Sequence, residues 1–307
     1  MDLKLAPIVL FTYNRPVHTK KVLDALAANA EAKDSILYIF CDGAQSSATE
    51  EMMKNINKTR LVARAENRFK EVTVKEQPVN NGLANSIING VTEVVNKYGT
   101  VIVMEDDIVT SPFFLRYMND ALEKYKDENR VACIHGYVYP VKGKLPETFF
   151  IKGADCWGWA TWKRAWDGFE KDGNKLLNQL QTNKLEHEFD FGGTYPYMQM
   201  LNNQINGIND SWAIRWYASA FLNNQFCLYP GVSLVQNIGI DGSGINSGQG
   251  SAHDVKICNR KIEITKLKME EDEKAKKQFS DYFIWLKKNQ HSVFRRIKNK
   301  LKRTLNK

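Results

Sequence analysis

The stretch Val101-Ile-Val-Met-Glu-Asp-Asp107 indicates both the fold of the chain and the position of its chemistry. Four apolar residues in a row are typical of a strand buried on both faces, as in a parallel sheet covered by helices. Three consecutive carboxylates follow directly. Because these like charges repel one another, Glu105, Asp106 and Asp107 either surround a hard divalent cation that also binds phosphate, or simply begin the next helix, where negative charge suits the dipole.

Similar apolar runs occur upstream and alternate with helical patterns. Alternation of β and α segments predicts an open, mostly parallel α/β sheet flanked by helices. Ligands of such sheets bind beyond the carboxyl ends of the strands. The runs are Pro7–Tyr13, Ile36–Cys41 and Val72–Lys75, and helical periodicity covers residues 83–95 and 113–125, the latter after Ser111-Pro112 as N-cap and first-turn proline.

Composition narrows the class of protein. The chain has 307 residues, enough for one large α/β domain, and its mean hydropathy of −0.44 and lack of an apolar run near eighteen residues exclude a membrane-spanning helix. The formal net charge is +8, and residues 291–307 hold seven basic residues and no acid. The remaining chain therefore carries about +1, which argues against nucleic acid as a partner.

Five cysteines lie far apart in the sequence, and none forms a C-x-x-C pair. We therefore expect reduced core thiols in a cytosolic protein, with neither a disulfide framework nor a zinc site. The first residues lack the charged and apolar segments of a secretion signal, and we expect the protein to stay in the compartment where it is made.

Polar motifs follow the first two predicted strands. Thr12-Tyr-Asn-Arg-Pro16 forms a turn from which Arg15 would reach a phosphate, unless Arg15 is an ordinary surface arginine. Cys41-Asp42-Gly43 ends the second strand, and Asp42 would either accept a hydrogen bond from a nucleobase ring N–H or form a plain Asp-Gly turn.

Two further motifs lie beside the predicted strand ends. Asn80-Asn-Gly-Leu83 begins a helix, so its backbone N–H groups either receive an anion or serve only as a helix cap. The glycine-rich residues 239–250 resemble a mobile lid, and His253 follows them as a metal or phosphate ligand, or as an exposed histidine. P-loop, dinucleotide and hydrolase signatures are lacking.

The order of these motifs resembles that of glycosyltransferases of the GT-A fold, which use nucleotide sugars on a Rossmann-like sheet. The likeness covers roughly residues 5–250, and the whole chain is similar to bacterial family-two-like enzymes of surface-polysaccharide assembly. The E-D-D-x-x-x-x-P-x-F-F portion resembles the N-acetylglucosaminyltransferase of N-glycan branching. The matching segments are P-I-V-L-F-T-Y-N-R-P, F-C-D-G, N-N-G-L-A, V-M-E-D-D-I-V-T-S-P-F-F and C-W-G-W-A-T-W.

The resemblance implies roles for the predicted site residues. Asp107 matches the carboxylate that binds Mn²⁺, or Mg²⁺, on the nucleotide diphosphate, and His253 is a second candidate metal ligand. Because this chain has E-D-D in place of D-x-D, one or two acids would touch the metal. The expected donor contacts are Glu105 and Asp106 to sugar and ribose, Asp42 to uracil, Arg15 to phosphate, Trp157 and Trp159 as a wall toward the acceptor, and Thr12, Asn14 and Asn81 beside them.

A catalytic base is implied further along the chain. In the related enzymes it lies on or just before a helix that follows the W-G-W segment. Asn209-Asp-Ser-Trp212 is the matching place, so Asp210 is expected to accept the proton of the attacking hydroxyl. The alternative is that Asp210 only caps this helix.

These expectations describe a metal-dependent, inverting glycosyltransferase that moves a hexosyl or N-acetylhexosaminyl group from a nucleotide sugar, of the UDP class, to a glycan or lipid-linked acceptor. The alternatives are a sugar-nucleotidyltransferase and a non-enzymatic, membrane-associated carbohydrate-binding protein with the same fold. We expect a GT-A domain over residues 1–255 and a C-terminal helical extension over 256–290.

Residues 291–307 form a predicted basic amphipathic tail. Phe294, Ile297, Leu301 and Leu305 fall at spacings of three, four and four, with basic residues around them. Such a helix lies in a membrane interface and is attracted by anionic headgroups. We therefore expect a cytoplasmic protein attached peripherally to the inner face of the membrane, with a solvated tail or a nucleic-acid contact as alternatives.

Overall fold

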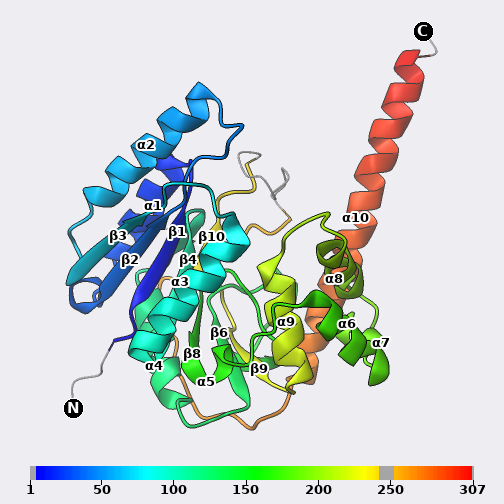
Figure 1. Cartoon of the computed structure of the whole chain (residues 1–307). Coiled ribbons are helices and arrows are strands. Elements are labelled where there is room, and N and C mark those ends of the chain that lie inside the picture. Colours follow the sequence, from blue (N-terminus) through cyan, green and yellow to red (C-terminus); the bar gives the residue numbers. More distant parts are fainter. Residues whose placement is uncertain (1–4, 242–251, 306–307) are drawn as a thin grey trace.

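The computed structural model describes residues 5–241 and 252–305, with side chains described as far as residue 289. Its centre is an eight-stranded sheet with the order β3-β2-β1-β4-β8-β6-β9-β7 (Figure 1). The apolar runs of the first half form four adjacent parallel strands, as predicted. These strands are β3 (Glu71–Glu76), β2 (Ile36–Cys41), β1 (Ile8–Thr12) and β4 (Thr100–Glu105).

The second half of the sheet is mixed. Its strands are β8 (Trp159–Trp162), β6 (Val131–His135), β9 (Phe226–Pro230) and β7 (Thr148–Lys152). Strand β8 is antiparallel to both β4 and β6, and β7 is antiparallel to β9. The other six strands share one direction. The predicted α/β class with a mostly parallel sheet is therefore confirmed.

Helices cover both faces of this sheet and bury its apolar side chains in two clusters. Helices α1 (Pro16–Ala27), α2 (Glu50–Arg64) and α4 (Phe114–Lys124) contribute to one cluster. Helices α3 (Leu83–Tyr98), α5 (Lys163–Trp166), α9 (Trp212–Leu222) and α10 (Glu273–Leu305) contribute to the other. A third cluster joins α9 to α6 (Gly173–Thr182), α7 (Glu186–Phe189) and α8 (Tyr197–Ile205). A short 3-10 turn, η1 (Ala32–Asp34), precedes β2.

A two-stranded ribbon follows the acidic stretch. Strand β5 (Ile108–Thr110) begins directly after Asp107 and pairs antiparallel with β10 (Val235–Asn237). The three acids therefore do not begin a helix, and that alternative is wrong. Helix α4 begins at Phe114, three residues after Ser111, whose hydroxyl accepts a hydrogen bond from the Phe113 N–H at 3.0 Å.

Residues 252–272, which we call the strap, contain no helix, although helical periodicity was expected from about residue 255. The strap is extended because it lies along the first core cluster, where Ile262 is fully buried. Its backbone bonds to the body, with the Cys258 N–H donating to the Ser233 carbonyl at 2.7 Å. Helix α10 then begins at Glu273 and packs on the opposite face. The helical part of the predicted extension over 256–290 therefore starts only at Glu273, and its division from the GT-A domain stays a prediction.

Two smaller expectations have clear outcomes. All five cysteines are free, and four of them are buried, as predicted for core thiols. In the part of the chain that the structure describes, none of the helices combines the length and apolar character needed to cross a bilayer.

Substitution of Phe279, on the buried side of α10, tests how firmly the helix belongs to the core. Its ring is 1% exposed and lies 4.9 Å from Tyr139 and 5.4 Å from Tyr229, measured between ring centroids. Phe279→Ala is expected to lower the free energy of unfolding by about 3–5 kcal/mol, measured by urea denaturation. The control Ile284→Ala, on the same helix but 39% exposed, should change it by about 0.5 kcal/mol or less. Equal effects would show that α10 is only loosely attached.

Candidate functional site

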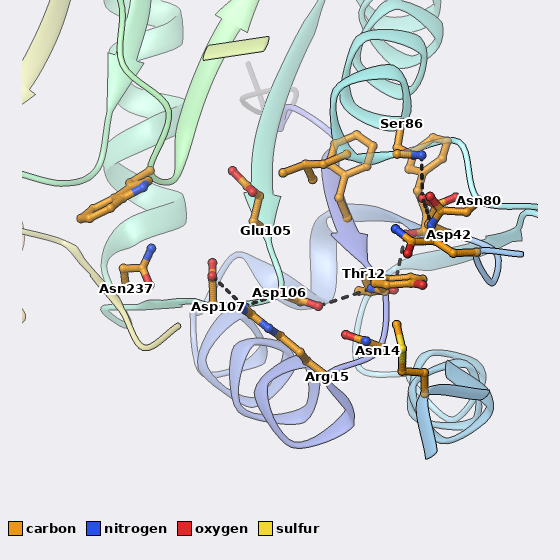
Figure 2. Close-up of a pocket in the computed structure, with 18 of the residues that line it drawn as sticks. Thr12, Asn14, Arg15, Asp42, Asn80, Ser86, Glu105, Asp106, Asp107 and Asn237 are labelled. Carbon is orange, nitrogen blue, oxygen red and sulfur yellow. Dashed lines mark hydrogen bonds and ion pairs between the residues drawn. The ribbon is translucent and has the colours of Figure 1, made fainter. Parts of the chain in front are cut away.

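A cavity of about 480 Å³ lies at the carboxyl ends of β1, β2 and β4, where the sequence predicted a site (Figure 2). Nine of the twelve predicted site residues line it, and Asn81, Trp159 and Asp210 do not. The nine are Thr12, Asn14, Arg15, Asp42, Glu105, Asp106, Asp107, Trp157 and His253.

Arg15 and the three acids form one charged group in this cavity. The Arg15 Nη1 atom lies 2.8 Å from Asp107 Oδ2 and 3.6 Å from Asp106 Oδ1 (Figure 2). Since the Arg15 side chain is only 13% exposed, it is not an ordinary surface arginine. One guanidinium group therefore faces three carboxyl groups, so Arg15 alone cannot balance the negative charge that they carry when ionised.

Burial and mutual repulsion raise the pKa values of two of these acids. Burial, together with the neighbouring charges of Asp107 and Asp106, raises the pKa of Glu105 to about 8. Burial and then Asp107 raise the pKa of Asp106 to about 7, while Arg15 opposes both shifts. Near neutral pH Glu105 is therefore mostly protonated and Asp106 partly so, and a further cation in the cavity would favour the ionised form of both.

The carboxylate oxygens in the cavity are suitable ligands for Mg²⁺ or Mn²⁺ bound to a nucleotide, although the protein alone does not supply a complete set of metal ligands. Among the side chains that the structure describes, no three His, Cys, Asp or Glu residues come together as a metal site, so His253 and the acids do not form one. Asp107 uses Oδ2 for Arg15, and its Oδ1 has no hydrogen bond within the described chain. One or two carboxylates suffice when phosphate and water complete the shell.

Gly239 packs closely against the Asp107–Arg15 pair. A Cβ atom at this position would collide with Asp107 Oδ2 and approach Arg15 Nη1 within 2.9 Å, so a larger residue here would displace these two side chains. The Ile238 N–H donates to the Asp107 carbonyl at 2.8 Å, and the Gly239 N–H donates to Asn237 Oδ1 at 2.7 Å. The ribbon of β5 and β10 thus positions Gly239. The expected lid over 239–250 lies outside the described residues from 242 onward.

The Asp42 carboxylate is saturated with hydrogen bonds. Its Oδ1 accepts from the N–H groups of Gly43 and Asn81 at 2.9 Å each. Its Oδ2 accepts from Asn80 Nδ2 at 3.0 Å and from the Gly82 N–H at 3.1 Å. The backbone N–H groups before α3, expected to receive an anion or cap the helix, therefore bind this carboxylate, and Asn81 makes its contact through its backbone.

The two tryptophans of the predicted wall lie in different environments. Trp157 lines the cavity, whereas Trp159 is 1% exposed and stacks on Trp212 in the core, with 5.4 Å between ring centroids. Between them Gly158 has a φ of +62° and ends the loop just before β8, so the two side chains do not share a surface. The expected wall contact of Trp159 is therefore wrong.

Asp210 lies outside the cavity lining. Its side chain is 62% exposed, and its Oδ1 pairs with Arg215 Nη2 at 2.9 Å. The cap of α9 is Ser211, whose hydroxyl accepts from the Ile214 N–H at 3.3 Å. The alternative that Asp210 is merely the helix cap is therefore wrong, and its role as base stays a prediction.

Comparison with known proteins decides the family. The family model described as "Glycosyl transferase family 2" matches residues 8–190, which include the sheet strands β1 to β4 and the acidic stretch. The chain belongs to glycosyl transferase family 2. No curated protein matches it significantly in sequence.

Solved structures similar to this family 2 chain include TarS of S. aureus, with a TM-score of 0.32 and 15% identity over 48% of this chain. The chain spans a quarter of the length of TarS. A second is a UDP-glucose pyrophosphorylase complexed with UDP-glucose, with a TM-score of 0.36 and 11% identity, covering 74% of this chain and 90% of that one.

The cavity of this family 2 chain is also lined by residues that were not predicted from the sequence. Phe11, Phe40 and Leu83 give it an apolar end, because their strand and helix termini meet there. The Ser86 hydroxyl is buried without a partner in the described chain and also lines the cavity. Its position four residues after Gly82, one helical turn into α3, was the only sequence signal for it.

Substitution of Asp42 tests whether it organises this end of the cavity. In Asp42→Asn an NH₂ group would face backbone N–H groups, leaving at least one buried donor unpaired. The free energy of unfolding is expected to fall by about 1–3 kcal/mol in chemical denaturation. The control Asp167→Asn makes the same change at an exposed carboxylate paired with Lys163 and should change it by at most about 1 kcal/mol. If the two variants are equally stable, Asp42 does not hold the turn before α3.

Proposed function

We propose that this protein is a metal-dependent, inverting glycosyltransferase that transfers a sugar from a UDP-sugar to a hydroxyl of a glycan or lipid-linked acceptor. Family membership supports sugar transfer, and the carboxylate cluster with Arg15 supports a diphosphate-bearing donor. The observation that carries the proposal is the position of this cluster at the carboxyl end of β4, within a cavity that also has an apolar end. Hexosyl and N-acetylhexosaminyl groups both suit this class.

The donor would lie across the cavity from its apolar end to its acidic end. The uridine would occupy the end with Phe40 and Leu83, and the diphosphate would lie beside Arg15. Arg15 now contacts Asp107 at 2.8 Å and makes bidentate contacts readily, so it can share its donors between carboxylate and phosphate. The donor sugar would then face Glu105 and Trp157.

The divalent ion, held by Asp107 and the diphosphate, would supply positive charge against the charge that develops on the leaving group. The chain's own residues provide the rest. Arg15 would orient the diphosphate, and Glu105 and Asp106 would accept hydrogen bonds from sugar and ribose hydroxyls once the cation restores their ionised forms.

The transfer would be a single displacement at the anomeric carbon. The acceptor oxygen forms a bond to this carbon while the bond to the diphosphate oxygen breaks, and Asp210 takes the proton of the attacking hydroxyl. Arg215 supports this assignment because it is 7% exposed, is held by the Ser211 and Lys171 carbonyls at 3.2 Å each, and fixes Asp210 Oδ1. Asp210 Oδ2 has no partner in the described chain and is open to an acceptor.

A donor screen tests the proposal directly. The protein is incubated with UDP-, GDP- and dTDP-sugars with and without Mn²⁺, and nucleotide release and thermal stabilisation are recorded. Release of UDP from one UDP-sugar only in the presence of the metal is expected. Stabilisation by free sugars without any nucleotide would instead support a carbohydrate-binding protein, and pyrophosphate release from UTP and a sugar phosphate would support a nucleotidyltransferase.

Two substitutions separate the metal ligand from the base. Asp210→Asn should leave the affinity for UDP with Mn²⁺ nearly unchanged and lower transfer by roughly 10²–10⁴-fold, the usual contribution of a general base. Asp107→Asn should instead weaken Mn²⁺-dependent UDP binding, measured by titration calorimetry. Asp167→Asn, an exposed carboxylate, is the control for both. Wild-type turnover in Asp210→Asn would assign the base role to another acid.

We further propose that the protein binds the inner face of the membrane through residues 291–307. The backbone of α10 continues to Leu305, so the apolar residues of this segment, spaced three and four apart, belong to one helix. The attraction to anionic lipid is worth about 1 kcal/mol for each basic residue near the surface. A lipid-linked acceptor would be presented at such a surface.

Deletion of residues 291–307 tests this attachment. The full chain should sediment with vesicles that contain anionic lipid, less so as salt increases, and the deleted chain should remain in the supernatant. Phosphatidylcholine vesicles are the control for charge, and transfer to a soluble acceptor should survive the deletion. Equal sedimentation of both chains would show that the tail is not an anchor.

A further inference from the structure

His253 is held at the rim of the cavity by the C-terminal helix. It lines the cavity, and its Nδ1 lies 2.9 Å from the hydroxyl oxygen of Tyr282 on α10. The same hydroxyl donates to the Ala252 carbonyl at 2.8 Å. A second tyrosine fixes the backbone, since the Tyr137 hydroxyl donates to the His253 carbonyl at 2.8 Å. His253 is therefore tied to two separate elements of the fold and is not a freely exposed side chain.

The two contacts of Tyr282 determine which nitrogen of His253 carries the proton. A phenol hydroxyl has one hydrogen, and the Ala252 carbonyl can only accept it. The hydroxyl oxygen is then the acceptor for His253, so Nδ1 must be the protonated nitrogen. Burial lowers the pKa of His253 below its ordinary value, which favours the neutral ring. In a neutral ring with Nδ1–H, the other nitrogen, Nε2, has a free lone pair.

The surroundings of Nε2 indicate what it would accept. It has no hydrogen-bond partner among the described residues, and the His253 and Trp157 rings form a T-shaped pair, with 5.7 Å between centroids and an interplanar angle of 84°. A lone pair cannot donate to a phosphate oxygen, so it suits a hydroxyl group or a metal. An aromatic side chain beside a hydrogen-bond acceptor suits a sugar, which has apolar C–H groups and hydroxyls.

We propose that Tyr282 is a positioning residue that holds His253 with Nε2 directed into the cavity, where it accepts a hydrogen bond from a hydroxyl of the donor sugar. This inference rests on the proposed function for the identity of the ligand. It also makes α10 part of the site, because Tyr282 lies one turn from Phe279, whose burial fixes the helix on the sheet.

Imidazole ¹⁵N spectra of the full chain test the positioning role without any donor. In the wild-type protein, His253, assigned by its loss in His253→Gln, should show the neutral Nδ1–H form. Tyr282→Phe keeps the ring packing and removes the hydroxyl, so the signal should move toward a mixture of tautomers. The control is Tyr125→Phe, which removes a hydroxyl that also binds a strap carbonyl, that of Thr265 at 2.8 Å, and should leave His253 unchanged. An Nε2–H form in the wild type, or no change in Tyr282→Phe, would overturn the inference.

Binding measurements test the ligand. UDP, UDP-glucose and UDP-N-acetylglucosamine are titrated with Mn²⁺ present. Loss of one hydrogen bond should raise the dissociation constant of the tighter-binding sugar nucleotide about three- to tenfold in Tyr282→Phe and His253→Ala, and leave that of UDP within about twofold. His253→Gln, which offers an amide oxygen near the position of Nε2, should recover part of the loss.

The remaining outcomes are decisive as well. An equal loss for UDP and for the sugar nucleotides in His253→Ala would show that His253 binds the metal or the diphosphate, and would overturn the sugar contact. Binding of none of the three ligands to the wild-type protein would contradict the proposed function and the sugar contact together. The ¹⁵N spectra would then still decide separately whether Tyr282 sets the tautomer.

Discussion

The charge balance at the end of β4 is the constraint on which the site depends. A parallel strand buried on both faces delivers three carboxyl groups to one point of the sheet edge, and Arg15 from the end of β1 is the cation that meets them there. Charges in a partly buried cavity interact strongly, and one arginine does not balance three acids. A site with this imbalance favours ligands that bring a cation, which is how a nucleotide diphosphate with a divalent ion enters protein sites.

A carboxylate also follows the end of β2, but there the protein itself supplies the hydrogen-bond partners. The backbone N–H groups of Asn81 and Gly82, just before α3, have no partner within the helix, and Asp42, directly after β2, accepts a hydrogen bond from each. The sheet edge therefore contains one carboxylate that is satisfied by the fold and a cluster that is not. This difference separates a structural acid from acids that are available to a ligand, although both follow a buried apolar strand in the sequence.

The sequence predicted those parts of the molecule that depend on local pattern. Continuous apolar runs identified β1 to β4, and the end of β4 located the cavity, because the strand ends follow from these runs and the parallel direction from the alternation of β and α segments. Trp159 was misplaced because its burial depends on Gly158 and on packing against Trp212, which no local period reveals. The extended strap was also not predicted. Its charged residues have helical spacing, but its backbone hydrogen bonds join it to residues that are distant in the sequence.

The C-terminal segment illustrates how distant parts of the chain complete the site. The strap lies on one face of the sheet and α10 on the other, and between them they contribute to both core clusters. The buried half of α10 fixes Tyr282, and Tyr282 in turn holds residues 252 and 253 beside Trp157. Because α10 continues without interruption to Leu305, the helix that orients His253 also bears the basic tail. The residues that order the rim of the cavity and the backbone of the tail therefore belong to one helix.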